Sequence, residues 1–275
     1  MNYRHGYHAG SFADVFKHLV LIELIQCLKY KEKPFCYLDT HAGSGIYPMQ
    51  EHLRKKPHES STGIAKIGNA LDTDTPQIIQ EYMNIIQSYE YPQYYPGSPF
   101  IAKHLLREND RLILIELHPE EHNLLRRNLS FDPRIAIHHQ NGFQSLKAYL
   151  PPKEKRGLIL MDPAFEQKED WEQMITAVKE GLKKFPMGVY ALWYPLKDER
   201  AVKKFLNALY ALNHQAILEL DLSIYPKDSP LSLYGCGLCV INAPWKFQEK
   251  CRTWLPWLWK TLSVSGAGRY YIGSL

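Results

Sequence analysis

The chain has few cysteines and no long uninterrupted hydrophobic run. Its 275 residues include five cysteines, at positions 27, 36, 236, 239 and 251. An odd number of cysteines scattered among apolar neighbours argues against a disulfide framework and favours a reducing compartment, so we predict a cytoplasmic protein. Residues 19–28 are apolar but are interrupted by Glu23 and Gln26. This interruption excludes a signal peptide or a membrane span there.

A full set of zinc ligands is also missing. Cys236 and Cys239 form a single CxxC, whereas a structural zinc site needs two further ligands at suitable spacing. The pair opens the apolar segment 238–241, which favours cysteines packed in the core. We therefore predict no metal at this motif.

Neither sign of charge dominates the chain. There are 33 lysines and arginines against 29 aspartates and glutamates, which gives a formal net charge of +4. This balance permits a nucleic-acid partner without requiring one. With 45% hydrophobic residues, the chain is long enough to bury a substantial core.

Apolar segments alternate with helical patterns along the chain. The alternation predicts an α/β fold in which a parallel sheet is covered by helices on both faces. Helix-spaced apolar residues occur at 119–129, 171–184 and 199–212. The expected strands are residues 35–39, 111–117, 135–139, 158–161, 188–193, 216–222 and 238–241.

The first two expected strands are too far apart for a single short crossover. Between them, Ile64, Ile67 and Leu71 recur at helical spacing, and a second helical pattern follows Thr75 and Pro76. We predict a small helical insertion subdomain at residues 48–97. The main domain then consists of residues 1–47 and 98–275.

Two glycines follow the first expected strand, in the turn Asp39-Thr-His-Ala-Gly43-Ser-Gly45. Glycines at the junction of a strand and a helix indicate that backbone approaches a ligand closely. A dinucleotide fingerprint requires a third glycine at position 48, but that residue is Pro48. This pattern disfavours NAD.

Polar residues follow the next strands in a definite order. Glu116 stands where an acid would accept the hydroxyls of a ribose, and Asn141-Gly142 stands where an adenine amine would bind. Asp162-Pro163 follows a buried strand and would meet an amine substrate. Taken singly, Glu116 is equally a strand cap, and Asp162-Pro163 is more often an ordinary turn. Their joint order indicates an S-adenosylmethionine-dependent methyltransferase.

With these motifs assembled, the chain resembles the RlmJ family, bacterial methyltransferases that modify adenine N6 in 23S ribosomal RNA. The segments that carry the resemblance are 3–18, 37–45, 95–99, 116–119, 142–143, 156–160 and 191–195. The resemblance implies a Rossmann-like class I S-adenosylmethionine-dependent methyltransferase sheet with a helical insertion. It also implies a catalytic aspartate at Asp162, cofactor contacts at His18, His41, Ser98 and Glu116, and RNA interaction at Tyr3, with Lys17 and His5 as weaker candidates.

The chain departs from the family pattern at two places. It has Asp162-Pro-Ala164-Phe165 where the family has Asp-Pro-Pro-Tyr, and Asn141-Gly142 where the family has Asp-Gly. Phe165 keeps an aromatic face, so we expect it to stack on the target base while the Pro163 carbonyl accepts from the amine. The amide oxygen of Asn141 still offers an acceptor to adenine.

Other functions remain open at this stage. A non-catalytic RNA-binding descendant of the fold would keep the cofactor pocket but lose turnover through the changes at Ala164 and Phe165. An adenine-N6 methyltransferase acting on DNA or another RNA would use the same catalytic loop. Scattered basic pairs such as Arg126-Arg127 are mostly solvated faces and do not choose among these substrates. We expect a monomer.

Overall fold

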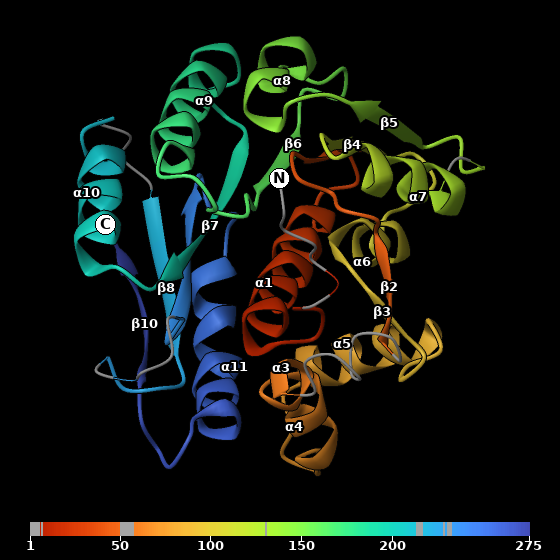
Figure 1. The fold of residues 1–275 in the computed structure, drawn as a ribbon. Helices are drawn as coiled ribbons and strands as arrows, with labels where there is room; N and C mark the ends of the chain where they lie inside the picture. Colours follow the sequence, from red (N-terminus) through yellow and green to blue (C-terminus); the bar gives the residue numbers. More distant parts are fainter. Residues whose placement is uncertain are drawn as a thin grey trace.

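An eight-stranded sheet runs through the molecule (Figure 1). The computed structural model describes residues 6, 8–49, 58–129, 131–212, 217–227, 229 and 233–275. The strands of this sheet are β1 (Cys36–Asp39), β4 (Arg111–Glu116), β5 (Ile135–His139), β6 (Gly157–Met161), β7 (Val189–Leu196), β8 (Ile217–Ser223), β9 (Gly235–Ile241) and β10 (Arg269–Ser274).

The order of the strands creates a crevice at one edge of the sheet. That order is β10-β8-β9-β7-β6-β1-β4-β5, and β5, β4, β1, β6 and β7 are parallel. From β1 the chain proceeds outward to β4 and β5, and then returns to the other side of β1 as β6. Loops on the two sides of this switch point diverge, which leaves room for a ligand at the carboxyl ends of β1, β4 and β6.

The predicted α/β class with a mainly parallel sheet is confirmed, and the strands beyond β7 add antiparallel pairs to it. Strand β9 pairs antiparallel with both β7 and β8, and β10 pairs antiparallel with β8. The cause lies in the connection between β8 and β9, residues 224–234, whose described residues include no helix. A parallel pair needs a crossover of a dozen residues or more, usually a helix, whereas a shorter link joins antiparallel strands.

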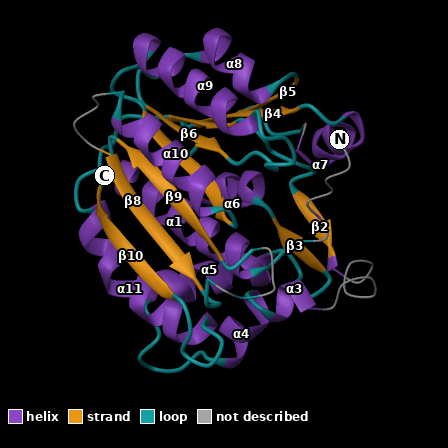
Figure 2. Ribbon diagram, turned by 60° about the vertical axis from the view of Figure 1, so that its left-hand side comes forward, coloured by secondary structure: helices purple, strands orange, loops and turns teal. Residues whose placement is uncertain are grey.

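Helices cover both faces of the sheet, as the sequence predicts (Figure 2). Apolar side chains alternate between the two faces along each strand, so each face contributes to its own core cluster. One face packs against α1 (Phe12–Lys29), α6 (Ser98–Leu105), α7 (Pro119–Leu129) and α11 (Phe247–Leu262). The other packs against α8 (Gly142–Tyr149), α9 (Asp170–Lys184) and α10 (Glu199–Tyr210).

The helices α3 (His58–Ser61), α4 (Ile64–Asn69) and α5 (Gln77–Ser88) lie in the segment between Pro48 and Tyr94. A two-stranded ribbon of β2 (Ile46–Pro48) and β3 (Tyr94–Pro96) leads into this segment and out of it. Ile67 and Tyr82 of the helices belong to the same core cluster as α1. The segment therefore shares the core of the main sheet, and its status as a separate subdomain stays a prediction.

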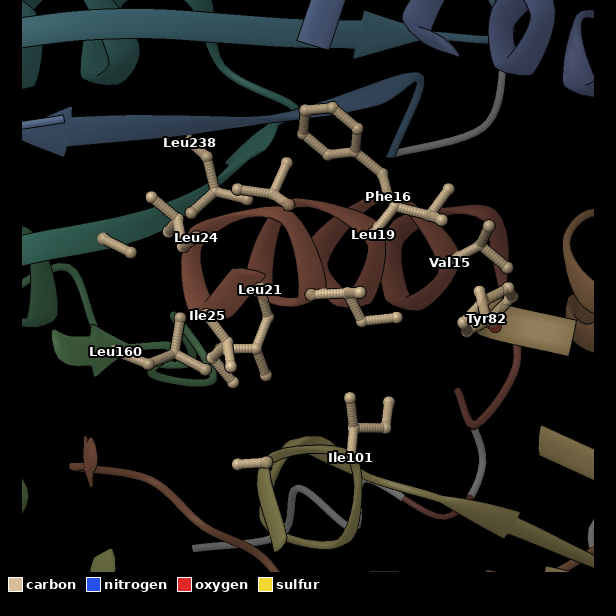
Figure 3. Close-up of a cluster of buried hydrophobic side chains, with 14 of the residues drawn as sticks. Val15, Phe16, Leu19, Leu21, Leu24, Ile25, Tyr82, Ile101, Leu160 and Leu238 are labelled. Carbon is tan, nitrogen blue, oxygen red and sulfur yellow. The ribbon is translucent and has the colours of Figure 1, made fainter. Parts of the chain in front are cut away.

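Helix α1 is the central element of the larger core (Figure 3). All but two of its residues are buried, so its apolar residues face neighbours on every side. Leu160 of β6, Leu238 of β9, Ile101 of α6 and Tyr82 of α5 surround it. Because α1 is held from all directions, the polar side chains that it carries have fixed positions.

All five cysteines are buried and free. Cys236 and Cys239 are three residues apart on β9 and therefore point to opposite faces of the sheet, one in each core cluster. This placement confirms the interpretation of the CxxC as core cysteines. Among the described helices, none has the length and apolar character needed to cross a membrane.

We expect truncation of α1 to be costly. Phe16 is fully buried, and Phe16→Ala should reduce the free energy of unfolding by about 3–5 kcal/mol, because it leaves a cavity that rigid neighbours cannot fill. Urea denaturation measures the change. Tyr210→Ala, at a side chain that is 68% exposed, is the control and should stay within about 0.5 kcal/mol of the wild type.

Candidate active site

A cavity opens at the carboxyl ends of β1, β4 and β6, where the strand order predicts a ligand site. Its volume is about 620 Å³, including its open mouth. The lining residues are Lys17, His41, Ala42, Gly43, Tyr47, Gly97, Ser98, Glu116, His118, Glu121, Asp162 and Ala164.

The backbone of the turn after β1 forms a hydrogen bond with the side chain of Glu116. Gly43 has φ +60°, and a Cβ at this position would lie 2.2 Å from the Tyr47 hydroxyl, so only glycine fits. The Gly43 N–H donates to Glu116 Oε2 at 2.7 Å, and the His118 N–H donates to Oε1 at 2.7 Å. Burial raises the pKa of Glu116, although these two N–H groups oppose the shift.

A second carboxylate lies beneath the cavity floor. Asp39, the last residue of β1, is fully buried and accepts hydrogen bonds from the hydroxyls of Tyr37 and Ser98, each at 2.7 Å. Burial raises the pKa of Asp39 and the hydrogen bonds counteract part of that shift. Ser98 begins α6, so this contact ties the end of β1 to the helix that follows the insertion.

The acid at the end of β6 is paired with a buried lysine. Lys17 Nζ lies 2.6 Å from Asp162 Oδ2 and 2.8 Å from Asp14 Oδ1. Lys17 is 4% exposed, whereas the Asp162 side chain keeps 14% of its surface open. Burial alone would lower the pKa of Lys17, but the two carboxylates outweigh it and hold that pKa well above its ordinary value. Lys17 is therefore a permanent cation beside Asp162.

The loop after Asp162 differs from our expectation. Phe165 is 5% exposed, and its ring packs against Trp171 and Trp193 in the core, with centroids 4.4 and 5.9 Å away. Its φ is +50°, unusual for an aromatic residue, and its carbonyl accepts from Lys197 Nζ at 3.1 Å. The structure therefore does not bring Phe165 to the cavity to stack on a base. Phe165 anchors the loop from the core side, while Pro163 is buried between Asp162 and Ala164.

Asn141 and Gly142 are also placed differently from the prediction. The Asn141 side-chain oxygen accepts from the Gln144 N–H at 3.1 Å and so caps α8, which uses the acceptor that we assigned to adenine. A Cβ at Gly142 would lie 2.0 Å from the Thr40 carbonyl oxygen. Gly142 thus allows the start of α8 to pack on the turn after β1.

Two histidines from the sequence prediction lie near the cavity. His41 lines it, and Thr40 Oγ1 lies 2.8 Å from His41 Nδ1. His18 is fully buried next to Lys17, with Nδ1 2.9 Å from the Tyr95 hydroxyl. Tyr3 and His5 lie outside the described residues. Within the described part of the chain, no three acidic, histidine or cysteine side chains converge as metal ligands do.

Sequence reasoning missed three polar residues of this region. Asp14 lies one helical turn before Lys17 on α1, and that i, i+3 spacing is a signal that could have revealed the pair. His118 and Glu121 follow Glu116 at the start of α7 and line the cavity. The pattern after Glu116 resembles an ordinary helix start, so their orientation required the structure.

The chain is similar to known proteins over nearly its full length. The model of the family described as "Ribosomal RNA large subunit methyltransferase D, RlmJ" matches residues 32–273. Ribosomal RNA large subunit methyltransferase J of Haemophilus influenzae is 40% identical over 276 residues, with 99% of this chain and 98% of that protein covered. The Escherichia coli protein of the same name is 41% identical over 271 residues, with 98% and 96% covered.

A solved structure is similar over almost the whole chain. The crystal structure of protein LPL1258 from Legionella pneumophila has a TM-score of 0.87 and 35% identity, and the match covers 97% of this chain and 98% of that one. Family model, relatives and structure therefore coincide over nearly the full length. The chain belongs to the RlmJ family of ribosomal RNA large subunit methyltransferases.

Proposed function

We propose that this protein transfers a methyl group from S-adenosylmethionine to the N6 amine of an adenine in 23S ribosomal RNA. The observation that carries the proposal is the pairing of Asp162 with buried Lys17, in the same cavity as the turn that joins Gly43 to Glu116. Two relatives named as ribosomal RNA large subunit methyltransferases support the RNA substrate. Such a substrate would place the enzyme in the cytoplasm, and we expect it to act as a monomer.

The residues of the cavity fit the cofactor. Glu116 lies at the end of β4 and would accept the hydroxyls of the ribose, while the turn at Gly43 gives the backbone close access. Ser98, held by Asp39, and His41 would line the methionine end near Asp162. When bound, the cofactor supplies an electrophilic methyl group on its sulfonium.

The chain's own residues would prepare the amine for attack. The N6 lone pair of adenine is delocalised into the ring, so the nitrogen must become pyramidal before it forms a bond. Asp162 Oδ1 and the Pro163 carbonyl would accept the two N–H groups and hold the nitrogen in that shape. As the N–C bond forms, the nitrogen becomes strongly acidic, and Asp162 takes its proton.

Lys17 would keep Asp162 ready for this step. Its ammonium stays charged and donates a hydrogen bond to Oδ2, which fixes the rotamer of Asp162. Asp14 Oδ1, 2.8 Å from Lys17 Nζ, is the second carboxylate oxygen that neutralises this charge. Lys17 therefore acts through Asp162 as a positioning residue.

Replacing the acid tests the proposal most directly. Asp162→Asn should reduce kcat for methyl transfer to unmodified 23S RNA by at least about 100-fold, because an amide cannot take the proton. The dissociation constant of S-adenosylhomocysteine should change little. Exposed Glu166 lies on the same loop, and Glu166→Gln is the control that keeps full activity. If Asp162→Asn turned over at a rate close to that of the wild type, the catalytic role of Asp162 would be refuted. If the wild type transferred no methyl group to RNA or DNA, a non-catalytic RNA-binding protein would be favoured.

Loss of Lys17 should slow methyl transfer more than it weakens cofactor binding. Lys17→Met removes the cation that fixes the rotamer of Asp162, so kcat should fall at least about ten-fold while the dissociation constant of S-adenosylhomocysteine changes little. Lys204→Met, at a lysine side chain that is 76% exposed, is the matched control and should keep full activity. A folded Lys17→Met enzyme with the kcat of the wild type would contradict this role.

His41 gives a prediction for stability. Burial lowers the pKa of His41 to about 4, below the value of roughly 6.5 in an unfolded chain. The unfolded chain therefore binds more protons between these values, so the stability contribution is complete above about pH 6.5 and is lost as the pH falls toward 4. Urea unfolding of the wild type and His41→Asn should show a difference that shrinks over this window. The same comparison for Met187→Ala, at an exposed side chain that does not titrate, should give a constant difference.

A further inference from the structure

Two buried polar atoms in the cavity wall have no hydrogen-bond partner among the described residues. They are His118 Nδ1 and Glu121 Oε2. Both residues line the cavity, and both stand at the start of α7, where the chain leaves β4. Buried polar groups in folded proteins are nearly always paired, so a pair of unsatisfied atoms in one cavity indicates that a ligand supplies the missing partners.

Glu116, the neighbouring acid, already has hydrogen-bond partners in the protein. Each oxygen of Glu116 already accepts one backbone N–H, from Gly43 and from His118. Each carboxylate oxygen can accept a second hydrogen bond, so Glu116 is held in place and still able to bind. Glu121 Oε2 instead requires a donor. A ligand that fits both carboxylates must therefore bring at least two donors to this end of the cavity.

We propose that Glu121 and His118 form a second hydrogen-bonding arm for the ribose of the cofactor, opposite Glu116. This inference rests on the proposed function, since it assumes an adenosine cofactor. A vicinal diol carries two O–H donors, one for each carboxylate, and its oxygens can pair with His118 Nδ1. Glu116 ends β4 and Asp162 follows β6, and these two strands flank β1 on opposite sides. A ribose bound at Glu116 therefore leaves the Asp162 side of the cavity for the reacting methyl.

Binding of a deoxy cofactor analogue tests the assignment without using activity. We expect Glu121→Gln to weaken the binding of S-adenosylhomocysteine about ten-fold in isothermal titration calorimetry, because a charged acceptor becomes a neutral one. Of the 2′-deoxy and 3′-deoxy analogues of S-adenosylhomocysteine, one should bind to the wild type and to the variant with equal affinity, because it lacks the hydroxyl that would donate a hydrogen bond to Glu121. Glu120→Gln, at the exposed neighbouring residue, is the matched control and should match the wild type.

The stability of the free protein gives a second readout. An unpaired buried carboxylate oxygen destabilises the free enzyme, so Glu121→Gln should unfold at the same temperature as the wild type or at a higher one. The rise in the unfolding temperature on adding S-adenosylhomocysteine should be smaller in the variant. A merely structural Glu121 would give the opposite result for the free protein. His118→Ala keeps the backbone N–H that Glu116 accepts and should weaken binding about three-fold.

The outcomes separate the inference from the function on which it rests. Unchanged affinity in Glu121→Gln, or an equal loss for S-adenosylhomocysteine and both deoxy analogues, would overturn the ribose assignment and leave the proposed function intact. If the wild-type protein does not bind S-adenosylhomocysteine, both are overturned. If the loss of affinity in Glu121→Gln is absent for one of the two deoxy analogues, the hydroxyl that this analogue lacks is the one that Glu121 binds.

Discussion

The buried ion pair between Lys17 and Asp162 is the constraint on which the rest of the site depends. An ammonium that is 4% exposed is tolerated only when its charge is balanced, so Asp14 and Asp162 must both stay within reach of it. That condition fixes α1 against the end of β6. The apolar contacts of α1 on all sides make it rigid, and the ion pair transmits that rigidity to the position of Asp162.

The cavity between these elements is strongly acidic. Glu116, Glu121 and Asp162 line it, and Asp39 lies buried behind Ser98, while Lys17 is the cation among the lining residues. A ligand with a sulfonium and an ammonium group suits such a wall better than a neutral one. The product of methyl transfer has lost the sulfonium charge, so the same wall would hold the spent cofactor less strongly than the fresh one.

Much of this arrangement could be predicted from the sequence, because its signals are local. Apolar runs that end in Asp39, Glu116 and Asp162 predicted the strand ends, and parallel strands bring such ends to one edge. The reversal of β9 escaped the prediction because strands expected at 216–222 and 238–241 leave room for a crossover, whereas β9 begins at Gly235 and the connection is shorter. The core position of Phe165 depends on Trp171 and Trp193, and the second contact of Lys17 lies 145 residues away. Such pairings exist only after folding.

The placement of Phe165 changes how the departure from the family pattern should be understood. The groups assigned to amine activation are Asp162 and the Pro163 carbonyl, and their positions depend on β6 and on Lys17. Phe165 has turned into the core, where two tryptophans and Lys197 secure it. The change from tyrosine therefore removes a hydroxyl from a side chain that supports the loop. The proposed activation of the adenine amine by Asp162 and the Pro163 carbonyl would be preserved. Any aromatic stacking on the adenine would then have to come from another part of the chain.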